Sequence, residues 1–246
     1  MIYGSASHKG CIRQLNEDSF SARLGKPGVE FALVADGMGG HNAGEIASGM
    51  VVEDVSEYMR SHDAPAIIAL RESIAKANDK VYEAASKRSD YTGMGTTVTL
   101  AILDRQEVAV ANVGDSRAYH YSPKKKKLVQ ITRDHSLAEE LIAAGRLKKE
   151  ELSTYAYRNV ITRAIGTSPT VAPDIFIQPW EENEILLLCT DGLTIHVSPE
   201  EIRQILKKRY SAQQMCDELV QKTIQAGGKD NVTVLIVINS DKGDAR

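Results

Sequence analysis

Four aspartates stand at or beside the ends of apolar runs, where a folded chain would present them on the rim of a core. They are Asp36, Asp115, Asp191 and Asp230. Three of them have a glycine as direct neighbour, and the fourth follows a Gly-Gly pair after one residue. Glycine lets the backbone turn sharply and approach a ligand closely, which a residue with a Cβ resists. One Asp-Gly dipeptide is typical of an ordinary turn, but its recurrence favours a shared chemical role.

The chemistry that such a set indicates is the binding of divalent cations. Carboxylates gathered in a poorly solvated place repel one another unless protons or cations compensate their charge. A ligand set made only of oxygen favours Mg²⁺ or Mn²⁺ over zinc or copper. This hypothesis requires that the strand ends share one rim, which the spacing along the chain does not establish. Four unrelated turns are the alternative.

Other kinds of catalytic or binding site find no support in the sequence. The run 93–97 has no lysine and lacks the P-loop spacing, and Asn42 stands where a dinucleotide-binding fingerprint needs its third glycine. No Gly-x-Ser-x-Gly elbow occurs, and the acids around Asp36 do not keep an EF-hand register. None of the three cysteines has an arginine six residues later, and the six histidines show no metal-ligand pairing.

Composition and charge narrow the class of protein further. The 246 residues include 42% hydrophobic and 26% charged side chains, which is ordinary for a globular protein. A formal net charge of −3 gives no reason to expect a nucleic-acid partner. We expect no membrane association, because no apolar run approaches the roughly 20 residues that span a bilayer. The first ten residues lack a signal-peptide apolar region, and three scattered cysteines argue against a disulfide framework. We therefore expect a cytoplasmic protein.

The elements that must position the aspartates follow from the hydrophobic pattern. Apolar or alternating runs predict strands at 2–8, 29–35, 97–103, 108–113, 118–121, 172–178, 184–189 and 232–238. Helical spacing predicts amphipathic helices over 46–59 and 67–85, with Asp63 capping the second and Pro65 in its first turn. Capping boxes predict further helices after Ser198 and Ser211. The strands between 97 and 121 are interpreted as a meander.

The stretch 134–163 is predicted to be an excursion between strands. It is polar and weakly patterned, apart from a short helix opened by the capping box at Ser136 and Glu139. Such a segment could move without harm to a core. Since the chain contains no linker, repeat or low-complexity tract, we expect a single domain over 1–241 and a short tail at 242–246.

Six short motifs carry a resemblance to a known family. They are Arg13…Glu17-Asp18, Asp36-Gly37-Met38-Gly39-Gly40, Gly93-Met94-Gly95-Thr96-Thr97, Val113-Gly114-Asp115-Ser116-Arg117, Thr190-Asp191-Gly192 and Gly228-Lys229-Asp230-Asn231. In this order they resemble the metal-dependent serine/threonine protein phosphatases of the PPM, or type 2C, family in their compact bacterial form. As a set they are highly specific, although each alone is weak; taken alone, the first would be interpreted as a solvated turn.

The resemblance implies an α+β fold and a binuclear metal centre. The fold is a four-layer α-β-β-α sandwich, in which two antiparallel sheets are flanked by helices. Two Mn²⁺ or Mg²⁺ ions would lie at one end of the sandwich, with a weaker third ion beside them. The resemblance implies that Asp36 bridges the two core ions and that the Gly37 carbonyl, Asp191 and Asp230 are further ligands. Asp115, with Asp191, would bind the third ion. Glu17 and Asp18 would hold metal-bound waters, and Arg13 would bind the phosphate.

The implied reaction is hydrolysis of phosphoserine and phosphothreonine on proteins by a metal-bridged water, in opposition to a cytoplasmic serine/threonine kinase. The partners would be phosphorylated proteins, such a kinase and its substrates among them, and we expect a monomer. A small-phosphoester hydrolase with the same centre is an alternative. Another is a non-catalytic pseudophosphatase that only binds phosphoproteins, although retention of every core ligand disfavours it.

Two positions depart from the family pattern. Met38 stands where many eukaryotic members have a histidine proposed as general acid, and a thioether cannot donate a proton. Bacterial members commonly share this feature, and a metal-bound water is the candidate donor. In the 134–163 segment, which matches the family's flap, Ala156 and Tyr157 precede Arg158-Asn159 where His-Pro is frequent.

Overall fold

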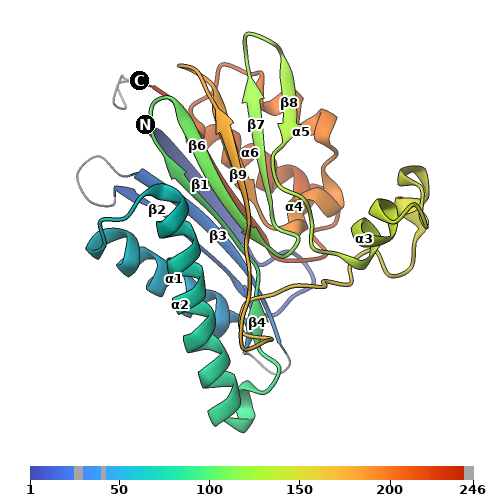
Figure 1. The fold of residues 1–246 in the computed structure, drawn as a ribbon. Helices are drawn as coiled ribbons and strands as arrows, with labels where there is room; N and C mark the ends of the chain where they lie inside the picture. The colour runs from blue at the N-terminus through green and yellow to red at the C-terminus, as the bar shows by residue number, and fades with distance from the viewer. Residues whose placement is uncertain (25–29, 40–42, 241–246) are drawn as a thin grey trace.

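The computed structural model describes residues 1–24, 30–39 and 43–240, and two β-sheets packed face to face form its centre (Figure 1). The first sheet contains, in spatial order, β1 (Ile2–His8), β11 (Val232–Ile238), β10 (Ile185–Cys189), β7 (Arg117–Ser122) and β8 (Lys127–Gln130). The second contains β2 (Asp18–Leu24), β3 (Glu30–Met38), β5 (Val98–Leu103), β6 (Glu107–Val113) and β9 (Asp174–Pro179), with β4 (Gly95–Thr96) paired to β3. Their strand pairs are antiparallel.

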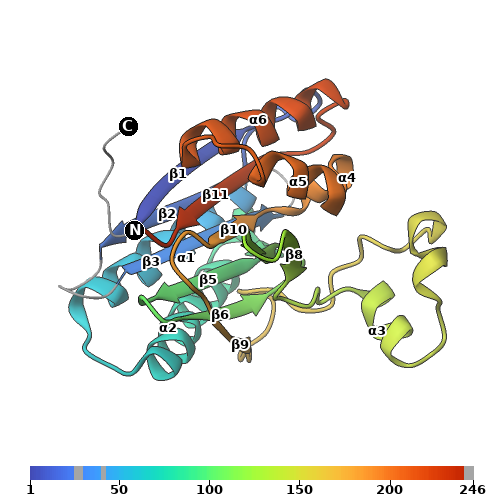
Figure 2. The same ribbon diagram turned by 90° about the horizontal axis from the view of Figure 1, so that it is seen from above.

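Helices cover the outer face of each sheet (Figure 2). The second sheet is covered by α1 (Gly44–Ser61) and α2 (Ala66–Lys87), and the first by α4 (Asp191–His196), α5 (Pro199–Leu206) and α6 (Ala212–Gln225). The remaining helical segments are α3 (Leu137–Ala143) and the 3₁₀ turns η1 (Ser89–Tyr91) and η2 (Lys149–Thr154). The predicted α+β fold with four α-β-β-α layers is confirmed.

Three buried apolar clusters fill the spaces between these four layers. On β3, Phe31 and Leu33 belong to the cluster under α1 and α2, whereas Ala32 and Val34 belong to the cluster between the sheets. Because side chains alternate along a strand, one covered on both faces has an unbroken apolar sequence. This is why the run 29–35, as far as the structure describes it, has the composition of a doubly buried strand.

The strand β3 is longer than its apolar run. It continues to Met38, so Asp36 and Gly37 lie within the strand. The apolar run alone had predicted that Asp36 would stand at the end of the strand. The strand is longer because it is paired on both sides: Asp18 of β2 stands opposite Asp36, and Thr96 of β4 stands opposite Gly37. The hydrophobic pattern ends before the hydrogen-bonded ladder does.

The predicted meander is wrong for its third strand. Strands β5 and β6 pair in the second sheet, but β7 lies in the first sheet beside β10. Between β6 and β7 the chain passes Gly114, whose φ of +106° is readily adopted only by glycine. A Cβ at Gly114 would also lie 2.5 Å from the Thr97 side chain. The backbone therefore turns from one sheet to the other at this glycine.

Three of the four N-cap residues predicted from the sequence are confirmed by the structure. Ser198 and Ser211 each form a capping box, and Ser136 accepts a hydrogen bond from the Glu139 backbone N–H. The predicted cap at Asp63 is wrong, because Pro65 is the residue that precedes α2 and it supplies no side-chain hydrogen bond.

The segment 134–163 projects from the body of the sandwich (Figure 2) and contains α3 and η2. A bridge between Ser136 and Ile161 closes its root. The predicted tail at 242–246 and Gly40 of the second motif lie outside the described residues. Among the described residues, no helix is both long and apolar enough to cross a membrane.

Candidate metal centre

The second sheet contributes Asp36, Gly37, Glu17 and Asp18 at one end of strands β2 and β3. Asp36 is fixed by its backbone, whose N–H donates to Thr97 Oγ1 at 2.9 Å. The Gly37 N–H donates to the Glu17 carbonyl at 3.1 Å. Since Asp18 stands opposite Asp36 in the ladder, antiparallel pairing places two carboxylates side by side.

The first sheet contributes Asp191 and Asp230. Asp191 begins α4 just after β10, and Asp230 lies just before β11. Because β10 and β11 are antiparallel neighbours, the end of one and the start of the other share an edge. Gly192 is required here, since a Cβ at this position would lie 1.8 Å from the Asn231 carbonyl oxygen.

Asp115 reaches the same edge from the loop between β6 and β7. Two residues after it, Arg117 pairs with Cys189 at the end of β10, which brings Asp115 close to Asp191. Asp115 is 8% exposed, and its Oδ1 atom has no hydrogen-bond partner among the described residues.

A hydrogen bond across the sandwich shows that the two groups form one rim. Thr190 Oγ1 of the first sheet donates to Asp18 Oδ2 of the second at 2.9 Å. The carboxylates of Asp36 and Asp191 are also close enough for the charge of Asp191 to help raise the pKa of Asp36. The convergence on which the metal hypothesis depended is therefore present in the structure.

Burial and mutual repulsion raise the pKa values of these aspartates. Burial, helped by neighbouring carboxylates, raises the pKa of Asp18 to about 7, of Asp191 to about 6 and of Asp115 to about 8. The pKa of Asp36 is raised well above its ordinary value, first by burial and then by the other aspartates. Near neutral pH these carboxyls therefore either keep protons or need cations nearby to compensate their charge.

The donor set fits divalent cations. Asp18 Oδ1 and Asp115 Oδ1 are buried oxygens without a partner among the described residues, and buried carboxylates require protons or cations nearby. Among residues 1–24, 30–39 and 43–240, no three His, Cys, Asp or Glu side chains are gathered tightly enough to enclose an ion. The aspartates therefore form an electrostatic cluster of hard oxygen donors and not a finished coordination shell.

Arg13 is a cation that the chain itself brings to this cluster, in addition to Arg117, whose charge acts on Asp115 and Asp191. Its Nη2 lies 2.8 Å from Asp230 Oδ2, and its Nη1 lies 3.9 Å from Glu17 Oε2. The side chain is 48% exposed, so the guanidinium lies at the boundary between the carboxylates and solvent. All eight predicted site residues thus lie at this end of the sandwich.

Two residues that hold the site residues in place, Thr190 and Asn231, and one neighbouring acidic residue, Glu45, were missed from the sequence. Thr190 holds Asp18, as described above. Asn231 fixes the loop that carries Arg13, because its Nδ2 donates to the carbonyls of Lys9 and Leu15, both at 2.9 Å, and its Oδ1 accepts from the Glu17 N–H. Glu45, in the first turn of α1, has a buried oxygen without a partner in the described chain. Thr190 and Asn231 each gave a signal, since each adjoins an aspartate within one of the six motifs, whereas Glu45 lies in none of them.

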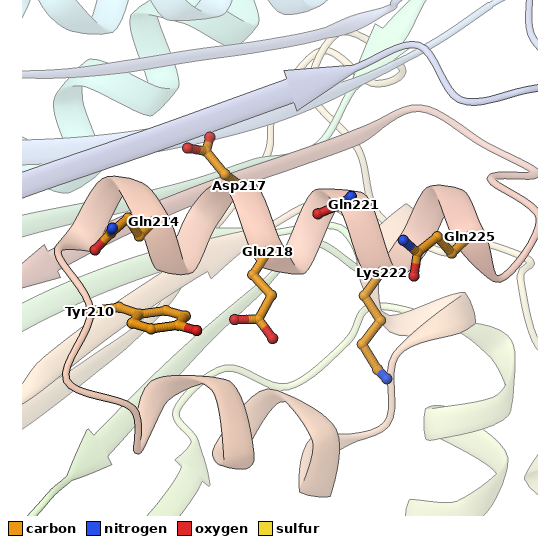
Figure 3. A pocket seen from close by; sticks show the side chains of 7 residues that line it. All are labelled: Tyr210, Gln214, Asp217, Glu218, Gln221, Lys222 and Gln225. Carbon is orange, nitrogen blue, oxygen red and sulfur yellow. The ribbon is translucent and has the colours of Figure 1, made fainter.

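A separate surface hollow of about 540 Å³ lies on α6 (Figure 3). Figure 3 shows the side chains of Tyr210, Glu218 and Lys222 directed toward the space between α6 and the preceding helix. Its lining contains none of the predicted site residues. The chemistry therefore belongs to the aspartate cluster and not to this hollow.

Comparison with known protein families gives a match over nearly the whole chain, including the residues of the cluster. A family model described as "Protein phosphatase 2C" matches residues 5–232, nearly the whole chain. The chain belongs to the protein phosphatase 2C family. It is accordingly a metal-dependent protein phosphatase, and the resemblance inferred from its ordered motifs is confirmed.

Individual members of the protein phosphatase 2C family are similar over almost their full length. Serine/threonine phosphatase stp of Listeria welshimeri is 38% identical over 234 residues, which cover 93% of this chain and 92% of that protein. Protein phosphatase PhpP of Streptococcus pneumoniae is 36% identical over 233 residues and 93% of each chain.

Solved structures of the family have the same fold. Stp1 from Staphylococcus aureus matches with a TM-score of 0.91 at 34% identity, over 99% of this chain and 96% of that one. The catalytic domain of the serine/threonine protein phosphatase PstP, solved in complex with two manganese ions, matches with a TM-score of 0.84 at 30% identity, over 95% and 96%.

Proposed function

We propose that this chain hydrolyses phosphoserine and phosphothreonine on proteins at the aspartate cluster. Asp36, Asp191, Asp230 and the Gly37 carbonyl would hold two core Mn²⁺ or Mg²⁺ ions. Asp115, with Asp191, would serve a weaker third ion, and Glu17 and Asp18 would orient metal-bound waters. The observation that carries the proposal is the convergence of carboxylates from both sheets, where buried oxygens have no partner among the described residues.

When bound, the two ions would lower the pKa of a shared water and offset the charge of the phosphate. The chain's own contribution is position. The ladder between β2 and β3 and the edge shared by β10 and β11 fix the carboxylates before substrate arrives, and such preorganisation lowers the cost of stabilising the transition state.

Arg13 is proposed to bind the phosphate. In the structure its guanidinium is paired with Asp230. If Asp230 ligated a metal ion, it would no longer pair with Arg13. The planar guanidinium of Arg13 would then be free to donate hydrogen bonds to a phosphate dianion. The exposed position of Arg13 allows this change without rearrangement of the core.

Replacement of Arg13 should therefore act mainly on substrate binding. For Arg13→Ala we expect KM to rise about tenfold, with a smaller change in kcat, because a ground-state contact to the phosphate is lost. Steady-state kinetics at saturating Mn²⁺ measures both constants, and Arg163→Ala, which alters a cation paired with Asp174, tests whether loss of any arginine suffices. An unchanged KM with a lowered kcat would assign Arg13 to the transition state instead.

Turnover of a phosphoserine or phosphothreonine peptide beside p-nitrophenyl phosphate tests the proposed function. With Mn²⁺ present we expect kcat/KM for the peptide to exceed that for the small ester, and excess EDTA to abolish both activities. Preference for the small ester would favour a small-phosphoester hydrolase. Binding of the peptide without turnover would favour a pseudophosphatase, and full activity in EDTA would contradict the metal mechanism.

The cellular setting is part of the proposal. We propose a monomer in the cytoplasm, formed by one domain over 1–241 with the flap at 134–163, that opposes a serine/threonine kinase. The apolar layer shared by the two sheets supports one domain. The free thiols of Cys11, Cys189 and Cys216 are typical of a reducing compartment.

A further inference from the structure

Glu45 is an acidic residue beside the aspartate cluster with no role assigned to it above. It lies in the first turn of α1. Its Oε2 atom is buried and has no hydrogen-bond partner in the described chain. An unpaired buried carboxylate oxygen costs free energy, so this position calls for an explanation.

The first turn of α1 is interlocked with Glu17 and Gly37. The Glu17 carbonyl accepts hydrogen bonds from the Gly37 N–H at 3.1 Å and from Ser48 Oγ at 2.6 Å. A Cβ on Gly37 would lie 2.1 Å from the Gly44 carbonyl oxygen. Strand β3, the start of β2 and the beginning of α1 therefore meet with no space between their backbones.

The Glu17 carboxylate lies directly on this turn. A Cβ on Gly44 would lie 2.5 Å from Glu17 Oε1 and 2.9 Å from Glu17 Cδ, so the carboxylate packs against the backbone of this turn. Glu45 is the next residue, and its charge is close enough to Glu17 to help burial raise the pKa of that carboxyl. Two carboxylates thus stand together beside Gly37.

Among the residues that the structure describes, positive charge does not satisfy this pair. Arg13 approaches Glu17 only to 3.9 Å and makes its short contact with Asp230. The α1 N-terminus offers a partial positive charge of about half a unit, which is less than two carboxylates require. The Glu45 oxygen that has no partner among the described residues is therefore available to a donor that those residues do not supply.

We propose that Glu45 is a positioning residue of the metal centre, which together with Glu17 accepts hydrogen bonds from the water shell of the ion served by the Gly37 carbonyl. The inference rests on the proposed function for the presence of that ion. Partners that hold a metal's ligands in place commonly change its affinity 10- to 100-fold when they are removed. Glu45 would thus set metal affinity without being a ligand.

The test compares Glu45→Gln with Glu53→Gln, a change to an exposed glutamate of the same helix. Mn²⁺ affinity and stoichiometry are measured by titration calorimetry, and the melting temperature is measured with and without Mn²⁺. For Glu45→Gln we expect one of the Mn²⁺ ions to bind about tenfold more weakly. The metal-free melting temperature should change little, because relief of repulsion with Glu17 offsets the lost attraction to the helix N-terminus.

The result that overturns the proposal is Mn²⁺ affinity within twofold of wild type, whatever happens to the metal-free stability. A structural residue would show that pattern, with a lower metal-free melting temperature and unchanged affinity. If Glu45→Gln fails to fold, Glu45→Asp is measured instead. This variant keeps the negative charge but moves it back by the length of one methylene group. A wild-type Mn²⁺ affinity of Glu45→Asp would then contradict the positioning role of Glu45. Failure of the wild type to bind Mn²⁺ would instead contradict the proposed function.

Discussion

Asp191→Asn should lower kcat about a thousandfold at saturating phosphopeptide, a loss typical of removing one essential electrostatic contact from a preorganised site. The substitution keeps the shape of the side chain but removes the negative charge that a cation requires. Asp191 begins α4 at the shared edge of β10 and β11, so a neutral isostere leaves the packing intact. The loss should therefore fall on metal binding and turnover and not on the fold.

The stability of the metal-free Asp191→Asn protein provides a control on this interpretation. Burial and the charge of Asp230 raise the pKa of Asp191 to about 6, so the folded state holds its proton to higher pH than the unfolded state does. Ionisation of this group therefore destabilises the wild type as pH rises from about 4 through 6. At pH 8, without metal, the variant should melt no lower than the wild type, and acidification through pH 6 to about pH 4 should narrow the difference.

Asp90→Asn is the matched substitution at an exposed aspartate that is not among the site residues, with a side chain 78% exposed. It should retain wild-type turnover and Mn²⁺ response. If Asp191→Asn also turned over at the wild-type rate under limiting Mn²⁺, Asp191 would not belong to the centre.

Gly37→Ala should destabilise the protein by about 3 kcal/mol or more, as overpacking against rigid atoms does. A Cβ there would lie 2.1 Å from the Gly44 carbonyl oxygen and 2.6 Å from the Glu17 carbonyl oxygen. Both are backbone atoms, so no side-chain rotation relieves the contact. Turnover should fall as well, because the carbonyl proposed as a ligand belongs to the residue that must move.

Gly49→Ala is the control for this prediction. Gly49 lies within α1, and a Cβ there would have no atom within 4 Å. Alanine in a helix interior is favoured over glycine by about 1 kcal/mol, so this variant should be more stable than wild type. Urea unfolding of both variants measures the difference. A Gly37→Ala protein as stable as wild type would mean that α1 does not press on β3 at this point.

Much of the fold was predictable because doubly buried strands have distinctive sequences. The runs that became β10 and β11 are apolar at nearly every position, since one face of each contacts helices and the other contacts a sheet. The periodicity of α1 and α2 and the serine caps of α5 and α6 were equally local signals. In each case the pattern of a few consecutive residues determines the element.

Long-range pairing could not be obtained in this way. Strand β7 follows β6 closely in the chain yet lies in the opposite sheet, because which sheet a strand joins depends on partners far away in sequence. Asp18 was interpreted, taken alone, as part of a solvated turn, although it is buried opposite Asp36. Its bond to Thr190, 172 residues away, has no local sequence signature.

The candidate site was predictable in part, because its residue types are a local signal whereas their convergence depends on long-range pairing. The types and motif order of Asp36, Asp191 and Asp230 predicted cation chemistry, and only folding could bring them to one edge. Glu45 shows the remaining limit: a glutamate in the first turn of a helix is expected as a favourable partner of the helix dipole. Nothing in its neighbours along the chain indicated a buried, unpaired oxygen beside Glu17.

The most direct test of the metal centre is a crystal grown with Mn²⁺ and measured at the manganese absorption edge. Two strong peaks of anomalous density are predicted at the end of the sandwich where both sheets meet. One should contact the carboxylates of Asp36, Asp191 and Asp230, and the other should contact Asp36 and the Gly37 carbonyl. The opposite result is manganese bound only elsewhere, in crystals that yield active phosphopeptide-hydrolysing enzyme when they are dissolved. That result would contradict a metal centre at the aspartate cluster.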